Sequence, residues 1–274
     1  MGGQYGVIGD PVAHSLSPLI HRGWMRDHGI DGDYRAFRIP AGTLQAGIAA
    51  LERDGVRGLN VTLPHKIHVA ALCDTRSPLA ETLGAVNTLS RQGDGAWFGD
   101  NTDYQGFLDD FDRAHAGRLQ ACPILVLGAG GAAQAIVRGL SARGYVVKVA
   151  NRTVSRAAAL VQSLGLPQDA ATSLESTPDV AAYSDAIVNT LSLGHGNTGT
   201  LDLGQGNGRL FYDISYGKAA EQSLARAARE GWKTADGLGM LVAQAALSFD
   251  IWHGVAPDRT AALARCRDAL RLVS

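Results

Sequence analysis

The sequence predicts an α/β protein made of two domains. Short apolar segments of strand length alternate with helix-length segments along the whole chain of 274 residues. The alternation begins afresh near residues 105–120, where a second series of strands starts. A chain of this length forms about two domains, and we expect a cleft between them, since such clefts commonly bind ligands.

The second series opens with the most specific pattern in the chain. The apolar segment Ile124–Leu127 suits a buried parallel strand, and a helix is expected over Ala132–Leu140. Between them, Gly128, Gly130 and Ala133 match the fingerprint G-x-G-x-x-G/A. These small residues permit a tight turn, close approach of the backbone to a pyrophosphate, and packing of helix on strand. The flanking strand and helix favour a Rossmann-type dinucleotide-binding domain over an ordinary glycine-rich turn.

The elements of the first series follow from apolar spacing and turn residues. A helix can begin at Ser17 because Pro18 suits a first turn. A hairpin is predicted where Gln92–Gly95 supplies turn residues between two strands. The expected strands are Tyr5–Gly9, Asp33–Ile39, Gly58–Thr62, Gly84–Arg91 and Ala96–Asp100, and the expected helices are Ser17–His28, Thr43–Asp54, Pro64–Leu72 and Asn101–His115.

The later elements complete a doubly wound sheet and then return to the first domain. Gly194–Gly208 is rich in glycine and polar residues, and we interpret it as a loop close to a ligand. The resulting assignment is a substrate-binding domain over 1–105, a nucleotide-binding domain over 106–236, and returning helices over 237–274. The further strands are Val146–Ala150, Ala186–Thr190 and Leu210–Ile214, and the further helices are Leu238–His253 and Thr260–Leu272.

Composition excludes several classes of protein. The chain has 25 basic and 26 acidic residues, so no overall field attracts nucleic acid or an acidic membrane. It has neither a signal-peptide pattern nor an apolar run long enough to span a bilayer. Three widely separated cysteines predict reduced thiols in a cytoplasmic protein. His65 and His68 are spaced for a metal pair, but no further ligand lies near them, and we expect no metal.

The residues after the second strand of the nucleotide-binding domain indicate which dinucleotide is bound. An NAD site usually carries an acidic residue there, for the ribose 2′-hydroxyl. This chain instead has Asn151, Arg152 and Thr153, with Arg156 shortly after. Arginines pair with a 2′-phosphate through charge-assisted hydrogen bonds. The pattern therefore favours NADP, the alternative being two ordinary surface arginines.

Three polar clusters follow predicted strands in the first domain. Ser15 and Ser17 lie where a helix begins, so they can receive a carboxylate, although helix capping alone would explain one of them. Lys66, in the second cluster, would by itself be an ordinary solvated charge. The third cluster contains Asp103, which could pair with it. Beside a nicotinamide, such a pair suits alcohol–ketone chemistry, because the ammonium stabilises a developing alkoxide and the carboxylate orients it.

Segments with these residues recur in one order over nearly the whole chain. HSLSP, NVTLPHK, NTDYQG and GMLVAQAA are the most specific of them, and together the segments resemble the shikimate dehydrogenase family, NADP-dependent enzymes of chorismate and aromatic amino-acid biosynthesis. The segments are GDPVAHSLSPLIH, GLNVTLPHK, ETLGAVNTL, GDNTDYQG, LGAGGAAQA, ANRTVSR, YDISY and DGLGMLVAQAALSF.

The resemblance implies a role for each matching position. Lys66 and Asp103 correspond to the catalytic pair, and whether Lys66 donates the proton or chiefly stabilises charge stays open. The residues expected to bind substrate are these two with Ser15, Ser17, Thr62, Asn87, Tyr216 and Gln244. The residues expected to bind NADP are Gly128, Ala129, Gly130, Gly131, Ala132, Ala133, Asn151, Arg152, Thr153, Arg156, Ile214, Gly237 and Met240.

The helix pattern supports one of these roles independently. Gln244 is polar in an otherwise apolar segment and follows Met240 by one turn, so both face the same way. A buried amide in such a position needs hydrogen-bonding partners.

Some positions depart from the usual family pattern. Arg22 follows His21, and Gly217 with Lys218 replaces a common Pro. Leu191–His195 is a variant of the segment beside the nicotinamide. These changes affect the expected cofactor geometry rather than the reaction.

The expected activity is reversible reduction of 3-dehydroshikimate to shikimate with NADPH, by a monomer or homodimer. One alternative is a quinate/shikimate dehydrogenase with relaxed substrate or NAD use. Another is a catalytically silent regulator that binds the ligand, against which the intact Lys66, Asp103 and Gln244 argue.

Overall fold

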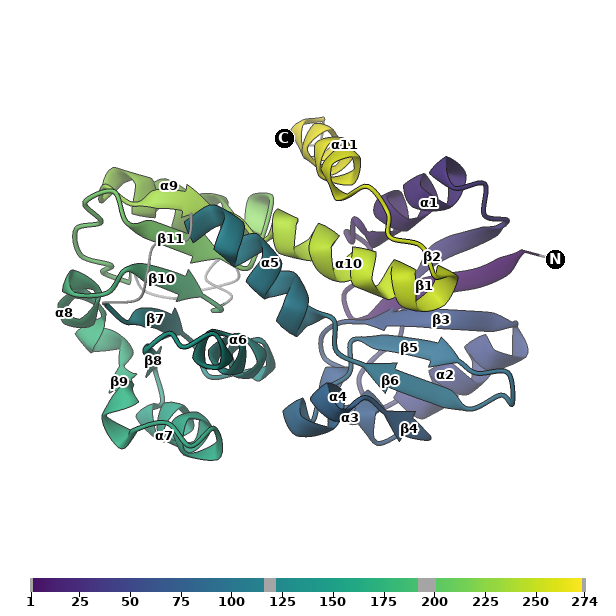
Figure 1. Cartoon of the computed structure of the whole chain (residues 1–274), viewed down its shortest axis with the longest axis horizontal. Helices are drawn as coiled ribbons and strands as arrows, with labels where there is room; N and C mark the ends of the chain where they lie inside the picture. The colour runs from purple at the N-terminus through teal and green to yellow at the C-terminus, as the bar shows by residue number, and fades with distance from the viewer. Residues whose placement is uncertain (1, 116–121, 192–200, 273–274) are drawn as a thin grey trace. The chain divides into compact units, whose positions relative to one another are not determined.

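The computed structural model describes residues 2–115, 122–191 and 201–272 and divides into two compact units (Figure 1). The first unit comprises Met1–Gly106 with Leu241–Val273, and the second Phe107–Met240. The chain changes unit inside two helices, α5 (Asp103–His115) and α10 (Leu238–His253). The predicted two-domain α/β fold class is confirmed, whereas the cleft and the boundaries at 105 and 236 stay predictions.

The first unit is built on a six-stranded sheet of order β2-β1-β3-β5-β6-β4. The pairs of β1 with β2 and β3 are parallel, while β5 is antiparallel to both β3 and β6. The predicted hairpin is confirmed as β5–β6. The strands are β1 (Gly3–Gly9), β2 (Gly32–Arg38), β3 (Val56–Val61), β4 (Thr75–Arg76), β5 (Thr88–Arg91) and β6 (Trp97–Asp100).

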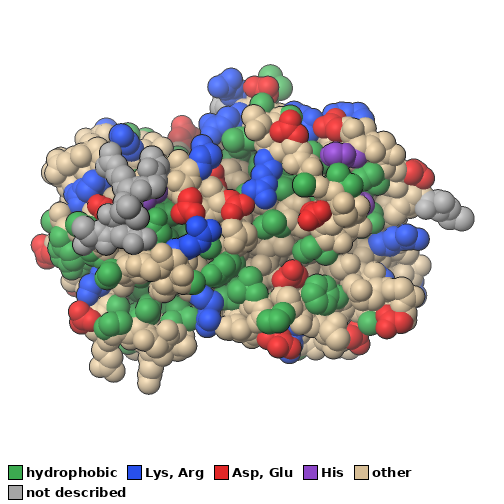
Figure 2. All heavy atoms as spheres, in the orientation of Figure 1, with side chains coloured by type: hydrophobic (Ala, Val, Ile, Leu, Met, Phe, Trp, Pro, Cys, Tyr) green, Lys and Arg blue, Asp and Glu red, His purple; other side chains and the backbone are tan. Residues whose placement is uncertain are grey.

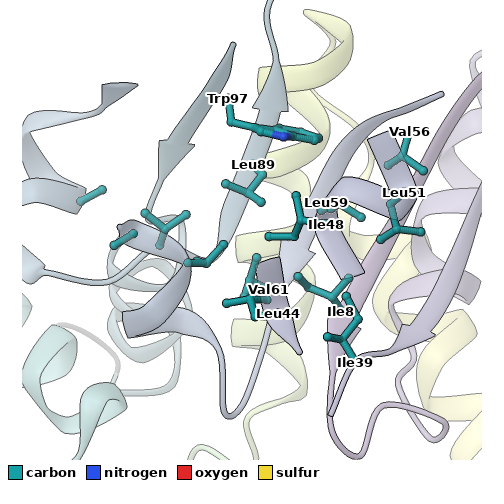
Figure 3. Packing of buried hydrophobic residues seen from close by; sticks show 14 residues of the cluster. Ile8, Ile39, Leu44, Ile48, Leu51, Val56, Leu59, Val61, Leu89 and Trp97 are labelled. Carbon is teal, nitrogen blue, oxygen red and sulfur yellow. The ribbon is translucent and has the colours of Figure 1, made fainter. Parts of the chain in front are cut away.

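One face of this sheet is covered by helices whose apolar residues meet those of the strands (Figure 3). Leu44, Ile48 and Leu51 come from α2 and pack with Ile8 and Leu59 of the strands. Their spacing of three and four residues places them on one side of the helix. The helices of this face are α2 (Leu44–Arg53), α3 (Lys66–Ala70) and α4 (Pro78–Leu83).

Aromatic residues of α1 (Ser17–Asp27) and α10 cover the opposite face. Trp252 of α10 contacts Tyr5 of β1 and donates its indole N–H to the Leu89 carbonyl at 3.0 Å. His21 of α1 stacks on Tyr34 with ring centroids 4.2 Å apart. His21 is 1% exposed, and its burial, together with nearby His253, lowers its pKa to about 3. α11 (Arg259–Arg271) packs against α1.

Burial of neutral His21 makes the free energy of unfolding depend on pH. An unfolded histidine takes up a proton near pH 6.5, whereas the folded one stays neutral down to about pH 3. The unfolded state therefore binds more protons in this window, so stability is complete above it and falls as the pH drops through it. In urea denaturation between about pH 7 and about pH 4, His21→Phe should lose stability less steeply than the wild type. Equal slopes would show that His21 does not titrate in this way.

The second unit is a six-stranded parallel sheet of order β12-β11-β10-β7-β8-β9. Every residue of β7, β10 and β11 is buried, as expected for central parallel strands covered on both faces. The strands are β7 (Ile124–Leu127), β8 (Val147–Asn151), β9 (Ala171–Ser173), β10 (Ala186–Asn189), β11 (Leu210–Asp213) and β12 (Lys233–Ala235).

Helices pack on both faces of this sheet. Ala181 of α8 and Ala227 of α9 join Leu125 and Phe211 in one core cluster. Phe107 and Phe111 of α5 contact the Tyr212 ring. The helices are α6 (Gly131–Ala142), α7 (Val154–Ser163), α8 (Thr177–Ala182) and α9 (Lys218–Arg229), with short 3-10 turns at Gln168–Ala170 and Leu174–Ser176.

Several predicted elements need correction. The expected strand Gly84–Arg91 begins only at Thr88, because Gly84 ends helix α4 in the left-handed region with φ of 60°. This helix was missed although Ser77 caps it and Pro78 opens it. The expected helix Pro64–Leu72 is limited to α3. Short edge strands β4, β9 and β12 were also missed, because two or three residues carry too little periodicity.

The surface matches the balanced composition. On the face shown in Figure 2, basic and acidic side chains are interspersed over both units. In the part of the chain that the structure describes, no helix has the length and apolar character needed to cross a membrane.

Candidate active site

Two helix starts bring Lys66 and Asp103 together in the first unit. Lys66 is the first residue of α3, and Asp103 the first residue of α5. The Lys66 Nζ donates to Asp103 Oδ2 at 2.6 Å, and their side chains are 28% and 14% exposed. The start of α5 further favours the negative charge of Asp103. This is a partly open ion pair, with donor capacity left on the ammonium for a ligand.

The backbone around this pair is fixed by local hydrogen bonds. Asn101 donates its side-chain amide to the Ala85 carbonyl at 3.0 Å and accepts from the Tyr104 N–H at 3.3 Å, which secures the start of α5. The Val86 N–H donates to the Lys66 carbonyl at 2.8 Å. Segments from three parts of the sequence are thus held at the ends of β3 and β6.

A buried group of amide and hydroxyl side chains lies in the same unit. Asn87 donates Nδ2–H to Thr102 Oγ1 at 2.9 Å and to Gln244 Oε1 at 3.3 Å. Asn87, Thr102 and Gln244 are 2%, 4% and 7% exposed. Gln244 reaches this group from α10, where Gly106 of α5 packs so closely that a Cβ would lie 2.7 Å from the Gln244 nitrogen. The predicted need of the Gln244 amide for partners is confirmed.

The serines and Thr62 occupy neighbouring turns of the first unit. Ser15 Oγ accepts from the Ser17 N–H at 3.2 Å in a local turn, whereas the N-cap of α1 is Leu16 and no side chain caps this helix, so capping accounts for neither serine. Ser17 is 4% exposed and hydrogen-bonds the Tyr34 hydroxyl. Thr62 follows β3 and packs against Gly9, where a Cβ would lie 2.4 Å from Thr62 Cγ2. Ser15 and Thr62 are both half-buried.

The glycine loop of the second unit has the form that a pyrophosphate requires. Gly128 has φ of 111°, and a Cβ there would lie 2.3 Å from Thr190 Oγ1, so the turn needs glycine. A Cβ at Gly130 or Gly131 would meet open space, which leaves room for a ligand above the start of α6. The first-turn N–H groups of a helix have no partner within it and can bind an anion. Ala133 is fully buried against the sheet. The residues present therefore fit a dinucleotide.

The arginines follow β8 at the start of α7. Asn151 donates its side-chain amide to the Thr153 carbonyl at 2.9 Å, and Thr153 is the N-cap of α7. Arg152 and Arg156 are exposed. Neither forms an ion pair with another residue in the described parts of the chain. Both remain available for a phosphate.

A buried carboxylate organises the loops after β10 and β11. Asp213 accepts from the Asn189 amide at 2.8 Å, from the Ser215 N–H at 2.8 Å, and from the Ser223 hydroxyl. Its burial raises the pKa of this carboxyl. Gly237 packs against this loop, because a Cβ there would lie 2.0 Å from the Ile214 carbonyl oxygen.

The remaining predicted residues lie in the second unit or outside the described residues. Tyr216 and Met240 are half-buried in the second unit. The segment 192–200, which contains most of the predicted loop beside the nicotinamide, lies outside the described residues. Our sequence reasoning missed Thr88 and Ser248, although Ser248 follows Gln244 by one helical turn, which is a signal for a shared face.

Comparison with known proteins decides the family. Residues 7–89 match the shikimate dehydrogenase substrate binding domain, residues 111–223 the shikimate/quinate 5-dehydrogenase family, and residues 237–267 the shikimate 5′-dehydrogenase C-terminal domain. The chain belongs to the shikimate dehydrogenase family. A family member from Hyphomonas neptunium, named shikimate dehydrogenase (NADP(+)), is 49% identical over 272 residues and 98% of each chain is covered.

Solved structures of the family have the same fold. The shikimate dehydrogenase of Aquifex aeolicus aligns with a TM-score of 0.87 at 34% identity, covering 97% of this chain and 98% of that one. The enzyme of Thermus thermophilus, in complex with NADP(H) and shikimate, aligns with a TM-score of 0.81 at 34% identity, covering 97% and 99%. The predicted family is thereby confirmed.

Proposed function

We propose that this chain is an NADP-dependent shikimate dehydrogenase, which reversibly reduces 3-dehydroshikimate to shikimate in chorismate and aromatic amino-acid biosynthesis. The observation that carries the proposal is the Lys66–Asp103 pair at 2.6 Å, in the same unit as the buried Asn87–Thr102–Gln244 group. Such a set combines a cation for an oxygen that gains charge with amides for hydroxyl groups. Family membership and NADP complexes among the relatives support it.

The catalytic pair acts on the oxygen of the substrate. Lys66 directs its ammonium at the carbonyl of 3-dehydroshikimate and stabilises the alkoxide that develops. Asp103 holds the ammonium in place and shares the movement of the proton. Bound NADPH supplies the hydride. In the reverse direction the same pair receives the hydroxyl proton of shikimate.

The other proposed residues bind and orient the two ligands. Ser15, Ser17 and Tyr216 bind the carboxylate, and Thr62, Asn87 and Gln244 bind ring hydroxyls. The first turn of α6 binds the pyrophosphate, and Arg152 and Arg156 bind the 2′-phosphate. Ile214, Gly237 and Met240 lie against the nicotinamide. A cytoplasmic monomer or homodimer agrees with the free thiols of Cys73, Cys122 and Cys266.

Initial rates of cofactor reduction test the assignment. Shikimate and quinate are each combined with NADP and NAD, and kcat/KM is measured for all four pairs. We expect shikimate with NADP to be the best of the four pairs. With shikimate, kcat/KM for NADP should exceed that for NAD by at least about tenfold, because each charged hydrogen bond to the 2′-phosphate contributes about 1.5–3 kcal/mol. Comparable rates with quinate or NAD would identify an enzyme of relaxed specificity. Shikimate binding without turnover would identify a silent regulator.

A further inference from the structure

A continuous chain of buried polar side chains ends at Asn87. Its five members come from β2, β3, α10, β5 and the residue before β5, and we call them the hydroxyl–amide chain. Each is 4% exposed or less, so water cannot replace a lost partner at low cost. The members are Tyr34, Asn60, Ser248, Thr88 and Asn87.

The first link fixes the orientation of the Asn60 amide. Tyr34 donates its hydroxyl to Asn60 Oδ1 at 2.8 Å. Burial raises the pKa of Tyr34 well above its ordinary value, so the hydroxyl keeps its proton and remains a donor. The Asn60 oxygen therefore faces Tyr34, and its Nδ2–H donates to Ser248 Oγ at 2.9 Å.

The next links lead to Asn87, and the Ser248 hydroxyl has a second neighbour in the Gln244 carbonyl at 3.1 Å. Ser248 Oγ and Thr88 Oγ1 are 2.7 Å apart, and Thr88 donates to Asn87 Oδ1 at 3.1 Å. The Thr102 N–H also donates to Asn87 Oδ1, at 2.7 Å. With two donors on its oxygen, the Asn87 amide is oriented with its NH₂ group toward Gln244 Oε1.

We propose that Thr88 and Ser248 are positioning residues for substrate binding, because they orient the Asn87 amide, which binds a ring hydroxyl. The inference rests on the proposed substrate-binding role of Asn87 and Gln244. If the amide were reversed, Asn87 Oδ1 would face Gln244 Oε1, and two acceptors would oppose each other. Thr88 and Ser248 are 1% exposed or less, so they act through Asn87.

A matched pair of variants at Thr88 tests the inference. Thr88→Val removes the hydroxyl and keeps the branched shape, whereas Thr88→Ser keeps the hydroxyl and loses a methyl group. Titration calorimetry with shikimate should give about five- to tenfold weaker binding for Thr88→Val, since one buried hydrogen bond is lost. Thr88→Ser should bind within about twofold of the wild type. In the steady state, KM should rise for Thr88→Val while kcat stays within about twofold.

The action through Asn87 is tested by a double-mutant cycle. In an Asn87→Ala background, Thr88→Val should weaken shikimate binding no further, because the amide that it orients is gone. Ser248→Ala should weaken shikimate binding as Thr88→Val does. It replaces Thr88→Val in the test if that variant does not fold. Ser184→Ala is the control, since Ser184 in the second unit is also buried and, among the contacts described, its hydroxyl donates to the Val180 carbonyl of the preceding helix α8.

The outcomes separate the two proposals. Unchanged shikimate affinity in Asn87→Ala would overturn the substrate role of Asn87 and the inference with it. If Asn87→Ala weakens binding but Thr88→Val and Ser248→Ala do not, only the positioning role is wrong. Equal losses from Thr88→Val in both backgrounds would also contradict it, because they indicate a general effect on the fold.

Discussion

Replacing Lys66 with Met is expected to lower kcat for shikimate oxidation by roughly 10³-fold, within the range of proton-transfer and charge-stabilising groups. Methionine has similar length and fills similar space, but it carries neither the charge nor a proton. Shikimate should still bind, since the carboxylate and hydroxyl contacts remain. Stopped-flow and steady-state rates with NADP, together with calorimetric binding of shikimate, measure the two effects separately.

The control for this variant is a second lysine with a carboxylate partner. Lys148 bonds Asp169 at 3.0 Å in the second unit, and Lys148→Met should leave kcat within about twofold. Circular dichroism and thermal unfolding show whether each variant is folded. A Lys66→Met enzyme with turnover near that of the wild type would exclude Lys66 as the group that acts on the carbonyl oxygen.

Replacing both Arg152 and Arg156 with Ser is expected to reduce the preference for NADP over NAD by about 100-fold. Each exposed guanidinium offers charge-assisted hydrogen bonds to the 2′-phosphate, of which even one per arginine contributes about 1.5 kcal/mol. The loss should appear in KM for NADP, because the phosphate lies far from the reacting atoms. KM for NAD should change little, since NAD lacks that phosphate.

The matched control is an exposed arginine on another helix of the same unit. Arg229 of α9 bonds only the Ala225 carbonyl of its own helix among the contacts described, and Arg229→Ser should leave both cofactors unaffected. An unchanged KM for NADP in the Arg152/Arg156 double variant would mean that other residues determine the preference for NADP over NAD.

The elements predicted correctly are those with strong local patterns. Ile124–Leu127 is both apolar throughout and followed by small residues in a fixed spacing, so strand, turn and helix could all be predicted. The Lys66–Asp103 contact could be inferred because both residues follow strands and the chemistry needs such a pair. By contrast, α4 was missed because its six residues are too few to show a helical periodicity, although Ser77 caps it and Pro78 opens it.

The residues that orient others could not be predicted in this way. Thr88 and Ser248 are ordinary small polar residues in sequence, and their contact at 2.7 Å joins positions 160 residues apart. Only the fold brings β5 against α10. Asp213 likewise gains its role from three donors that come from a neighbouring strand, the following loop and α9.

The discontinuity of the first unit has a consequence for synthesis on the ribosome. Phe107–Met240 is one uninterrupted stretch, so its sheet can close as soon as that stretch has emerged. The first unit lacks α10 until much later, and with it Trp252, Phe249 and Gln244. Until then only α1 covers this face of the sheet, through the stacking of His21 on Tyr34, and Tyr5 lacks its contact with Trp252. The first unit begins to be synthesised first and is therefore the last to finish folding. α10 completes both its apolar core and its buried group of amide and hydroxyl side chains.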